Sequence, residues 1–305
     1  MSTSTFRAAV VRHPGGPDSV DIVDVPLREP GPGQVRVRIA AAPVNPVDLG
    51  VAAGLFHDRG LIHQAEHTGL GWEFAGTIDA VGPGAHLSIG TRVAGLVAGF
   101  DRDFGPYAEQ LVVPAADVAV VPREVDLIAA STIPLNGLAA ARIVDLLGAA
   151  PRDADRLLIT GAAGVVGGYL TVLAQHRGWR VTGLARAGDE EFVRGLGADF
   201  TTEAEPGWDA VADAAALQER SLALVRDDGM FVGVRPNAGP PAERGITVAA
   251  VEVRPDGRRT RDLLLRAASG GLPIRVHEIV PLEKVAEAHR SMARGGVRGR
   301  LVLIP

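Results

Sequence analysis

The sequence predicts an α/β protein in which a β-rich domain is followed by a domain with a doubly wound parallel sheet. Two patterns support this prediction. Up to about Pro122, short β-branched runs such as "QVRVRIAAAPV" alternate with Gly-Pro turns, as expected for short strands and their connections. From Asp155 onward, apolar runs such as "RLLIT" alternate with helical runs, and this alternation is typical of a parallel sheet that helices cover on both faces.

The change of pattern also gives the expected domain boundaries. An Ala/Leu-rich stretch with helical periodicity, interrupted at Pro134, separates the two patterns. We expect a β-rich substrate domain over 1–124 and a dinucleotide-binding domain over 125–254. The last segment, 255–305, ends in a strand-like run and is expected to return to the first domain. Strands of the parallel sheet are expected at Leu157–Thr160, Val181–Leu184 and Met230–Val234.

The composition excludes several classes of function. The chain of 305 residues has a formal net charge of −5 and no cluster of Lys and Arg, so we expect no nucleic-acid partner. Its apolar runs are shorter than the roughly 18 residues of a membrane span, and its first residues lack the pattern of a secretory signal. We therefore expect a cytoplasmic protein with no membrane partner. Cysteine is absent, which excludes disulfides, thiolate nucleophiles and cysteine-ligated zinc.

The segment "ITGAAGVVGGYL", residues 159–170, carries a glycine at every third position, Gly161, Gly164 and Gly167. It follows an apolar strand-like run and opens a helical run, which is where a dinucleotide-binding turn belongs. Gly164 would let the backbone approach a pyrophosphate, and Gly167 would let the helix pack closely on the strand. The helix N-terminus would attract the negative charge. Ala162 stands where the strict G-x-G-x-x-G pattern has its first glycine.

The next strand-like run indicates which nucleotide the turn prefers. A site for NAD has an acidic side chain at the end of this strand, where it holds the ribose hydroxyls. Here the strand ends in Ala185 and Arg186, and the first acidic residue is Asp189. Arg186 would pair with a 2′-phosphate through charge-assisted hydrogen bonds. The sequence therefore predicts NADPH as the cofactor.

Several longer segments resemble one known superfamily in order and spacing. They are "APVNPVDLGVAAG", "GWEFAGTIDAVGPGAHLSIGTRVAGL", "GPYAEQLVVPA", "TIPLNGLAAARIV", "LLITGAAGVVGGYLTVLAQHRGWRV", "VRGLGAD" and "PLEKVAEAHRSMARGGVRGRLVLIP". The chain resembles the medium-chain dehydrogenase/reductase superfamily, in its zinc-free quinone oxidoreductase and enoyl reductase branch. This resemblance implies a GroES-like first domain, a Rossmann-type second domain and a cleft between them where NADPH reduces a quinone or an α,β-unsaturated carbonyl compound.

The resemblance also implies which residues take part in catalysis. Asn45 would lie beside the nicotinamide and the substrate. The tyrosine that assists protonation in related enoyl reductases is replaced by Phe56, or in other relatives by Leu49. His57 is the best substitute, because an imidazole supplies a proton near neutral pH. Asn136 is the other polar residue expected near the cleft.

Contacts to the cofactor are expected from the glycine turn, from the ends of two strands and from the C-terminal strand. The predicted residues are Asn45, Gly161, Ala163, Gly164, Val165, Val166, Gly167, Ala185, Arg186, Gly233, Val234 and Arg300.

No metal site is expected. Zinc members of the superfamily have a histidine in a "GHE" segment, and this chain has Trp72 there, in "GWE". The segment "HQAEH", from His63 to His67, matches the H-x-x-E-H pattern of some metallopeptidases. Its flanks, "DRGLI" and "TGLG", do not predict the long helix that this pattern needs, so we interpret it as a loop. A short-chain reductase is also disfavoured, because neither Tyr107 nor Tyr169 has a lysine four residues later.

Two other functions remain open at this point. The missing tyrosine is compatible with redox-neutral chemistry, such as cyclisation or isomerisation of a biosynthetic intermediate. It is also compatible with a non-catalytic protein that senses NADPH. Consumption of NADPH with quinones and enones separates these functions from a reductase.

A homodimer is expected from the end of the second domain. In relatives, the final strand of this domain pairs with its copy in a second subunit. The run "GITVAAVEVRP", Gly245–Pro255, is apolar and β-branched, and an uncovered edge strand of this kind favours pairing. Substitution of Val251 by proline is expected to weaken the dimer by removing a backbone donor.

Overall fold

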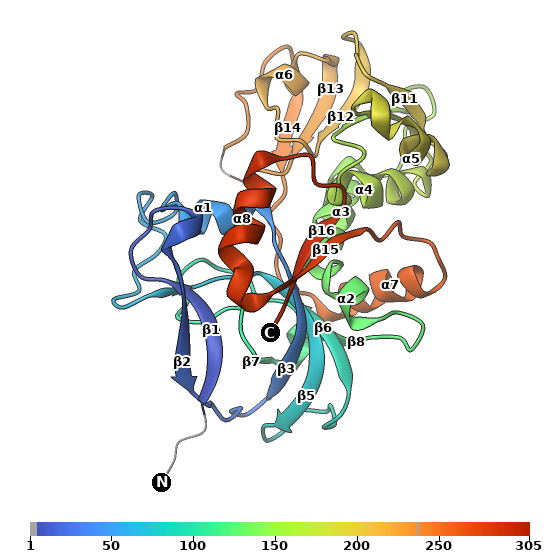
Figure 1. Ribbon diagram of the computed structural model, residues 1–305. Coiled ribbons are helices and arrows are strands. Elements are labelled where there is room, and N and C mark those ends of the chain that lie inside the picture. The colour runs from blue at the N-terminus through green and yellow to red at the C-terminus, as the bar shows by residue number, and fades with distance from the viewer. Residues whose placement is uncertain (1–4, 237) are drawn as a thin grey trace. The chain divides into compact units, whose positions relative to one another are not determined.

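The computed structural model describes residues 5–236 and 238–305 and contains two compact units (Figure 1). We name them the β-rich unit and the sheet unit. The β-rich unit comprises Met1–Leu135, Arg254–Ser269 and Ile274–Pro305, and the sheet unit comprises Asn136–Val253 and Gly270–Pro273.

The β-rich unit is built from ten strands and short helices among the described residues. The strands are β1 (Thr5–Val11), β2 (Val20–Pro26), β3 (Gln34–Pro43), β4 (Thr68–Gly69), β5 (Glu73–Val81), β6 (Arg92–Leu96), β7 (Gln110–Pro114), β8 (Val118–Val120), β15 (Val276–Pro281) and β16 (Arg300–Ile304). The helices are α1 (Pro46–Ala52), α2 (Leu127–Ser131), α7 (Gly257–Ala268) and α8 (Val285–Arg294), with single 3-10 turns η1 (Pro17–Ser19), η2 (Ala115–Asp117) and η4 (Leu282–Lys284). Helix α3 (Pro134–Leu147) begins in this unit and continues into the sheet unit.

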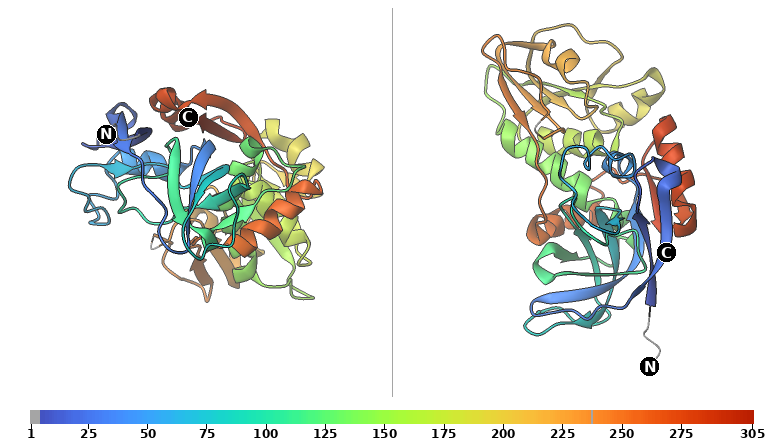
Figure 2. Two further views of the ribbon diagram at one scale, coloured as in Figure 1. Left: turned by 90° about the horizontal axis from the view of Figure 1, so that it is seen from below. Right: turned by 90° about the vertical axis from the view of Figure 1, so that its left-hand side faces the viewer.

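The strands of the β-rich unit form two sheets, and the C-terminal segment completes the larger one. The small sheet has the order β2-β1-β4, and the large sheet has the order β15-β16-β3-β5-β6-β8, with β7 also paired to β3. Strand β16 lies antiparallel to β3, and β15 lies parallel to β16. The C-terminal helix α8 packs beside α1 and η1 at the beginning of the chain (Figure 2). The C-terminal strands and helix thus belong to the same compact unit as the first part of the chain.

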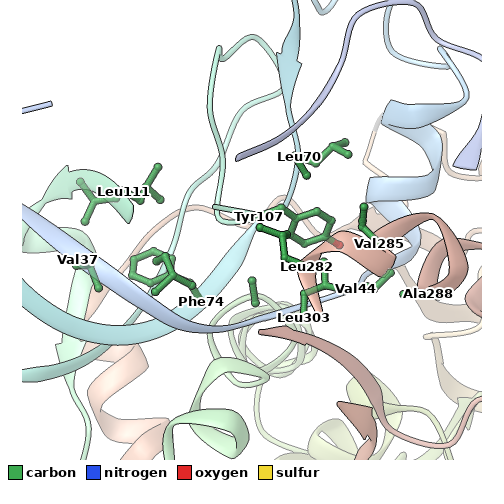
Figure 3. Packing of buried hydrophobic residues seen from close by; sticks show 14 of the residues in the cluster. Val37, Val44, Leu70, Phe74, Tyr107, Leu111, Leu282, Val285, Ala288 and Leu303 are labelled. Carbon is green, nitrogen blue, oxygen red and sulfur yellow. The ribbon is translucent and has the colours of Figure 1, made fainter. Parts of the chain in front are cut away.

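The core of the β-rich unit forms because buried and exposed side chains alternate along its strands, as in the first half of β3. Tyr107 lies in the middle of this core and is fully buried. Figure 3 shows its ring among Leu70, Leu282 and Val285. Because a buried tyrosine needs a partner for its hydroxyl group, this packing draws polar groups into an otherwise apolar core.

The sheet unit is a six-stranded parallel sheet with the order β11-β10-β9-β12-β13-β14. Its strands are β9 (Arg156–Thr160), β10 (Arg180–Leu184), β11 (Asp199–Thr201), β12 (Trp208–Asp213), β13 (Val225–Gly233) and β14 (Thr247–Ala250). Its further helices are α4 (Val165–Gln175), α5 (Glu190–Gly195) and α6 (Glu219–Leu222), with the 3-10 turn η3 (Ala187–Asp189). Numbered within this unit, the strand order is 3-2-1-4-5-6, the order of a dinucleotide-binding sheet. The predicted fold class is confirmed.

The two faces of this sheet are covered differently, which the sequence pattern did not predict. On one face the longer helices pack closely: a Cβ atom on Gly183 would lie 2.6 Å from Val193 of α5. On the other face Leu158 packs in a cluster with Leu222 of the one-turn helix α6. The connection from β11 to β12, residues 202–207, contains no helix and includes Pro206 and Gly207. A connection of this length cannot cross several strands and also form a helix.

No helix in the described part of the chain is long and apolar enough to cross a membrane.

Candidate functional site

The carboxyl edge of the parallel sheet is the first candidate site. Strand β9 pairs with β10 on one side and with β12 on the other, and the chain leaves it for α4 through the turn at Gly161–Gly164. The strand order reverses at this point, and the crevice at such a switch point is where open α/β sheets bind their ligands. The glycine turn therefore lies where the topology predicts a nucleotide.

A glycine is suited to each of the three positions of the turn for a different physical reason. Gly161 has a φ of 63°, a conformation that glycine adopts without strain. Gly164 is the N-cap of α4 and offers no side chain to the first-turn N–H groups, which leaves these donors for an anion. A Cβ atom on Gly167 would lie 2.2 Å from the carbonyl oxygen of Gly161. Gly167 is thus required for the close approach of the helix to the turn.

The loop after β12 is fixed to this turn by a buried carboxylate. Asp213 and Thr160 are fully buried, and the Thr160 hydroxyl donates to Asp213 at 2.6 Å. The other bonds to Asp213 come from the backbone N–H of Leu217, at 3.1 Å, and of Gln218, at 2.7 Å. A Cβ atom on Gly161 would lie 3.1 Å from the Cβ atom of Ala215. The loop and the glycine turn therefore pack against each other.

Gln218 joins the loop after β12 to the loop after β13. It has a φ of 57° and is 8% exposed. Its side-chain amide donates to the carbonyl oxygen of Ala238, whereas its Oε1 atom is buried without a hydrogen-bond partner in the described residues. A positive φ at a buried glutamine stores backbone strain of roughly 1–3 kcal/mol. Strain together with an unpaired acceptor at a strand end is typical of a ligand-binding position.

The structure places the predicted cofactor residues of the sheet unit along this same edge. Ala163 is buried in the turn, and Val165 and Val166 begin α4. Ala185 and Arg186 follow β10, where Arg186 is exposed and has no ion-pair partner among the residues described. Gly233 ends β13 and Val234 follows it. The turn and the start of α4 follow the carboxyl end of β9, and the other residues lie at the carboxyl ends of β10 and β13, as expected for a nucleotide site.

The β-rich unit contains a second candidate site, a buried network of polar side chains around Asn45 and Asp48. Asn45 is the N-cap of α1, and its backbone N–H donates to Asp48 at 2.9 Å. The hydroxyl group of Tyr107 donates to the same carboxylate at 2.9 Å, and the N–H of Gly71 donates at 3.1 Å. The side-chain amide of Asn45 donates to Glu73 at 3.0 Å. All four side chains are at most 1% exposed.

Burial sets the protonation of the two carboxylates. Burial raises the pKa of Glu73 to about 7, although the nearby positive charge of Arg300 opposes the change. Burial likewise raises the pKa of Asp48 to about 6, against the hydrogen bonds from Asn45 and Tyr107. Removal of a charge from water disfavours its ionised form. Both carboxyl groups therefore keep a proton at higher pH than an exposed carboxyl group does.

Arg102 supplies a positive charge to this network. Its guanidinium group donates to the carbonyl oxygens of Gly71, of Val97 at 2.9 Å and of Gly99 at 2.8 Å. Burial lowers the pKa of Arg102 to about 10, with the charge of Asp48 acting in the opposite direction. The side chain therefore remains positively charged at neutral pH and balances the buried carboxylates.

The predicted catalytic residues occupy different surroundings. The second carboxylate oxygen of Glu73 accepts the N–H of Leu135 at 2.8 Å. The next residue, Asn136, is buried. His57 lies apart from this network, and its Nε2 atom is 3.3 Å from the hydroxyl oxygen of Thr68. Its Nδ1 atom is buried without a hydrogen-bond partner in the described chain. Arg300, predicted as a cofactor contact, is 9% exposed and interacts electrostatically with Glu73.

The sequence interpretation missed Glu73, Tyr107, Arg102 and Gln218. The sequence contained an indication of Glu73, because it stands at the start of the mostly apolar strand "EFAGTIDAV". A carboxylate that is buried there needs a hydrogen-bond partner. The others gave no signal, because their partners lie far away in the sequence. Tyr107 and its acceptor Asp48, for example, are 59 residues apart.

The H-x-x-E-H segment is a loop in the structure, as interpreted from its flanks. The Nδ1 atom of His63 lies 3.3 Å from Asp101, and the ring of His67 contacts Phe104 at a centroid distance of 5.2 Å. Across the described ranges, no group of three His, Cys, Asp or Glu side chains has the arrangement of a metal site. These residues do not fit a zinc ion.

Comparison with known protein families gives two matches. Residues 31–123 match the alcohol dehydrogenase GroES-like domain, and residues 187–303 match the zinc-binding dehydrogenase domain. The first match falls in the β-rich unit, and the second begins after β10 of the sheet unit and extends to β16.

Individual relatives agree with these matches. The chain is 28% identical to the 2-haloacrylate reductase of a Burkholderia species, over 98% of both chains. It is 32% identical, over 99% of its length, to part of the polyketide synthase GfsB of Streptomyces halstedii, and it spans 6% of that synthase. Among solved structures, the quinone oxidoreductase from Coxiella burnetii has a TM-score of 0.87 and 24% sequence identity over 99% of this chain and 100% of the other. At this identity the solved structure supports the fold.

Proposed function

The chain belongs to the medium-chain dehydrogenase/reductase superfamily of oxidoreductases, and on this basis we propose that it is a zinc-independent reductase that transfers hydride from NADPH to a quinone or an α,β-unsaturated carbonyl compound. The observation that carries the proposal is the glycine turn at the switch point of a sheet with the order β11-β10-β9-β12-β13-β14. A nicotinamide dinucleotide supplies the hydride when it is bound.

The residues at the carboxyl edge of the sheet fit a dinucleotide. The turn at Gly161–Gly164 and the uncapped N-terminus of α4 would hold the pyrophosphate through backbone N–H groups. Arg186, exposed at the end of β10 and free of an ion pair among the described residues, would bind the 2′-phosphate. Strands β9 to β11 would carry the adenosine half, and β12 to β14 the nicotinamide half.

The β-rich unit supplies the residues for the substrate under this proposal. Asn45 is held by Glu73 and by the Asp48 carboxylate, so its amide group has a fixed orientation. A group held in this way loses little entropy when it binds a ligand. Glu73, which accepts a hydrogen bond from the Asn45 amide, would hold that amide in place without meeting the substrate itself. His57, partly exposed, would supply protons from solvent.

The experiment that tests the proposal measures consumption of NADPH with a panel of quinones and enones. Turnover with at least one acceptor, retained after dialysis against a chelator, supports the proposal. Activity that disappears with the chelator and returns with zinc contradicts the zinc-independent mechanism. Equal affinity for NADPH and NADH in an isothermal titration contradicts the choice of cofactor.

A redox-neutral reaction on a biosynthetic intermediate is the second candidate. Phe56 favours it, because it stands where related enoyl reductases have a tyrosine that assists protonation. Tight binding of NADPH without turnover of any acceptor in the panel would support this candidate, or a non-catalytic sensor, over the reductase.

We also propose a homodimer that forms through β14. This strand is an edge of the six-stranded sheet in the described structure, and an uncovered edge favours pairing with a second copy. Val251 does not test this proposal, because its N–H donates to the carbonyl oxygen of Gly233 inside the sheet at 2.9 Å. Consecutive residues of a strand alternate in direction, so Ala250 directs its N–H toward the free edge.

The substitution Ala250→Pro is therefore the appropriate test of the dimer, measured by light scattering. The expected result is a dimer mass for the wild-type protein and a shift toward monomer for the variant. A monomer mass for the wild-type protein at tens of micromolar would rule out the dimer.

A further inference from the structure

The β-rich unit contains an indole N–H that is buried without an acceptor. Trp72 is 8% exposed, and its Nε1 atom has no hydrogen-bond partner among the described residues. The indole N–H of Trp179 donates to the carbonyl oxygen of Gly148 at 3.1 Å, and that of Trp208 donates to Glu205 at 3.0 Å. A buried donor without an acceptor lowers stability. Such a group in a native protein calls for a functional explanation.

The surroundings of Trp72 are aromatic. The ring of Phe100 meets the indole edge to face, with 5.1 Å between centroids and 72° between planes. Phe56 stacks on Phe100 with a centroid distance of 3.9 Å. The next residue, His57, has a buried Nδ1 atom that also lacks a partner in the described chain. The stacked pair of phenyl rings is thus in contact with the Trp72 indole and is followed in the sequence by a second ring with an unpaired nitrogen.

Arg102 makes the indole N–H a stronger donor. Its guanidinium carbon lies 5.0 Å from the centroid of the Trp72 ring, and the group is held there by the carbonyl oxygens of Val97 and Gly99. A cation over an aromatic face interacts with its π electrons. The resulting withdrawal of electron density from the ring leaves the N–H more positive, so it binds a negatively charged oxygen more strongly.

The backbone holds Trp72 in a fixed position. Its carbonyl oxygen accepts the N–H of Val97 at 2.7 Å. The next residue is Glu73, whose carboxylate holds the side chain of Asn45. The unpaired donor is therefore one residue away from the network that orients the proposed catalytic asparagine.

We propose that Trp72 is a catalytic residue that donates its indole N–H to the carbonyl oxygen of the substrate. The substrate is then a flat, conjugated carbonyl compound whose apolar body packs against the rings of Phe56 and Phe100. This proposal rests on the reductase function proposed above, and it supplies the electrophilic group that neither a zinc ion nor a tyrosine provides in this chain.

The proposed step balances in atoms and electrons. Hydride with its two electrons, supplied under the proposed function by NADPH that is oxidised to NADP+, adds to the β-carbon of the substrate. The C=C electron pair then moves to give an enolate, so the substrate is reduced. The carbonyl oxygen carries the negative charge and accepts the hydrogen bond from Trp72, which keeps its proton. A proton from water then adds to the α-carbon. Donors aimed at the oxygen that gains charge lower the barrier to such a step.

The test is the substitution Trp72→Phe, with Trp179→Phe as its matched control. Both indoles are buried, at 8% and 6% exposure, and both variants keep an aromatic ring. Trp72→Phe removes an unpaired donor, so the melting temperature is expected to stay the same or to rise. Trp179→Phe removes a paired donor, so the melting temperature is expected to fall. The effect on activity should be the reverse of the effect on stability. We expect kcat/KM to be about 100-fold lower for Trp72→Phe and unchanged for Trp179→Phe.

A spectroscopic probe gives a readout that does not depend on turnover. The conjugated aldehyde 4-(dimethylamino)cinnamaldehyde absorbs at longer wavelength when its oxygen accepts a hydrogen bond. We expect this shift on binding to the wild-type protein and to Trp179→Phe, and its loss in Trp72→Phe. A Trp72→Phe variant that keeps both the shift and kcat/KM overturns the role of Trp72 while leaving the reductase function intact. A wild-type protein that binds NADPH but neither shifts the probe nor reduces an acceptor overturns both proposals.

Discussion

The candidate sites of the two units differ in the kind of group that forms them. In the sheet unit the site consists mainly of backbone: strand ends, a glycine turn and the first N–H groups of α4. In the β-rich unit it consists of buried charged and polar side chains, with two carboxylates whose pKa values burial raises to about 6 and about 7. A backbone site depends on where a Cβ atom fits, whereas a side-chain network depends on the balance of buried charge. Substitutions in the sheet unit should therefore cause damage by steric overlap, and those in the β-rich unit by leaving a buried charge without its partner.

The largest effect is expected from Gly167→Val in the sheet unit. A Cβ atom here would lie 2.2 Å from the carbonyl oxygen of Gly161 and 2.8 Å from the Cα atom of Ala162, so the helix and the turn must separate. We expect loss of NADPH binding and a destabilisation of about 4 kcal/mol or more, measured by nucleotide titration and denaturant unfolding. Gly195→Ala is the control, because no atom lies within 4 Å of the added Cβ atom. Unchanged binding by Gly167→Val would show that this approach of helix and turn is not needed.

Arg102→Met should be the most damaging change of charge in the β-rich unit. The variant leaves buried Asp48 without its nearby cation and leaves carbonyl oxygens without donors. Removal of one partner of a buried ionic network costs about 3–5 kcal/mol, and chemical denaturation measures this loss. Arg28→Met is the control, because Arg28 also lies over a phenyl ring and pairs with Asp103, but at the surface. Its expected cost is about 0–1 kcal/mol. Similar losses for both variants would contradict the importance of burial.

The glycine turn was predicted from the sequence, whereas the network around Asp48 and Arg102 was not. The glycine turn, the strands of the parallel sheet and the position of Arg186 after a strand are local features, because one short segment contains each of them. The order of the strands in the sheet was not predicted. The network around Asp48 joins α1 to Tyr107 and Arg102, more than fifty residues later. Its existence follows from burial, which one sequence does not show. For the same reason the direction of the Val251 N–H and the uneven covering of the parallel sheet were not predicted.

Arg186→Ala tests the one position of the sheet unit where we expect a side chain, and not the backbone, to determine the preference for NADPH over NADH. The loss of a charge-assisted hydrogen bond to the 2′-phosphate, about 1.5–3 kcal/mol, should weaken NADPH binding about 10- to 100-fold. NADH binding should not change. Isothermal titration measures both, and Arg194→Ala, which removes an exposed arginine paired with Glu190 in α5, is the control. A parallel loss for both nucleotides would point to a general effect of Arg186 on the turn.

His289→Leu should give the smallest effect and adds a pH dependence. His289 in α8 is fully buried, neither ring nitrogen has a partner in the described residues, and burial lowers its pKa to about 4. Because the unfolded chain binds the proton from about pH 6.5 downward, the contribution of His289 lowers the stability of the wild-type protein as the pH falls from this value toward 4. Glu73 and Asp48 contribute in the opposite direction, because their pKa values are raised in the folded chain. The leucine variant should lack the contribution of His289 and be about 1 kcal/mol more stable at neutral pH.

Unfolding free energies between pH 7 and pH 4 test this prediction, with His277→Leu on the exposed part of β15 as the control. An identical pH dependence for His289→Leu and the wild-type protein would mean that another group titrates in this range.

We propose above that this chain transfers hydride from a nicotinamide to a carbon or oxygen acceptor. The most direct measurement uses NADPH deuterated at the transferable position of its nicotinamide, together with the best acceptor of the quinone and enone panel. Mass spectrometry of the product then follows the label. With an enone, we expect a single deuterium on the β-carbon of the product. The product should form at the same rate as NADPH is consumed. Product without deuterium, or acceptor converted with no change in NADPH, would contradict the proposed hydride transfer.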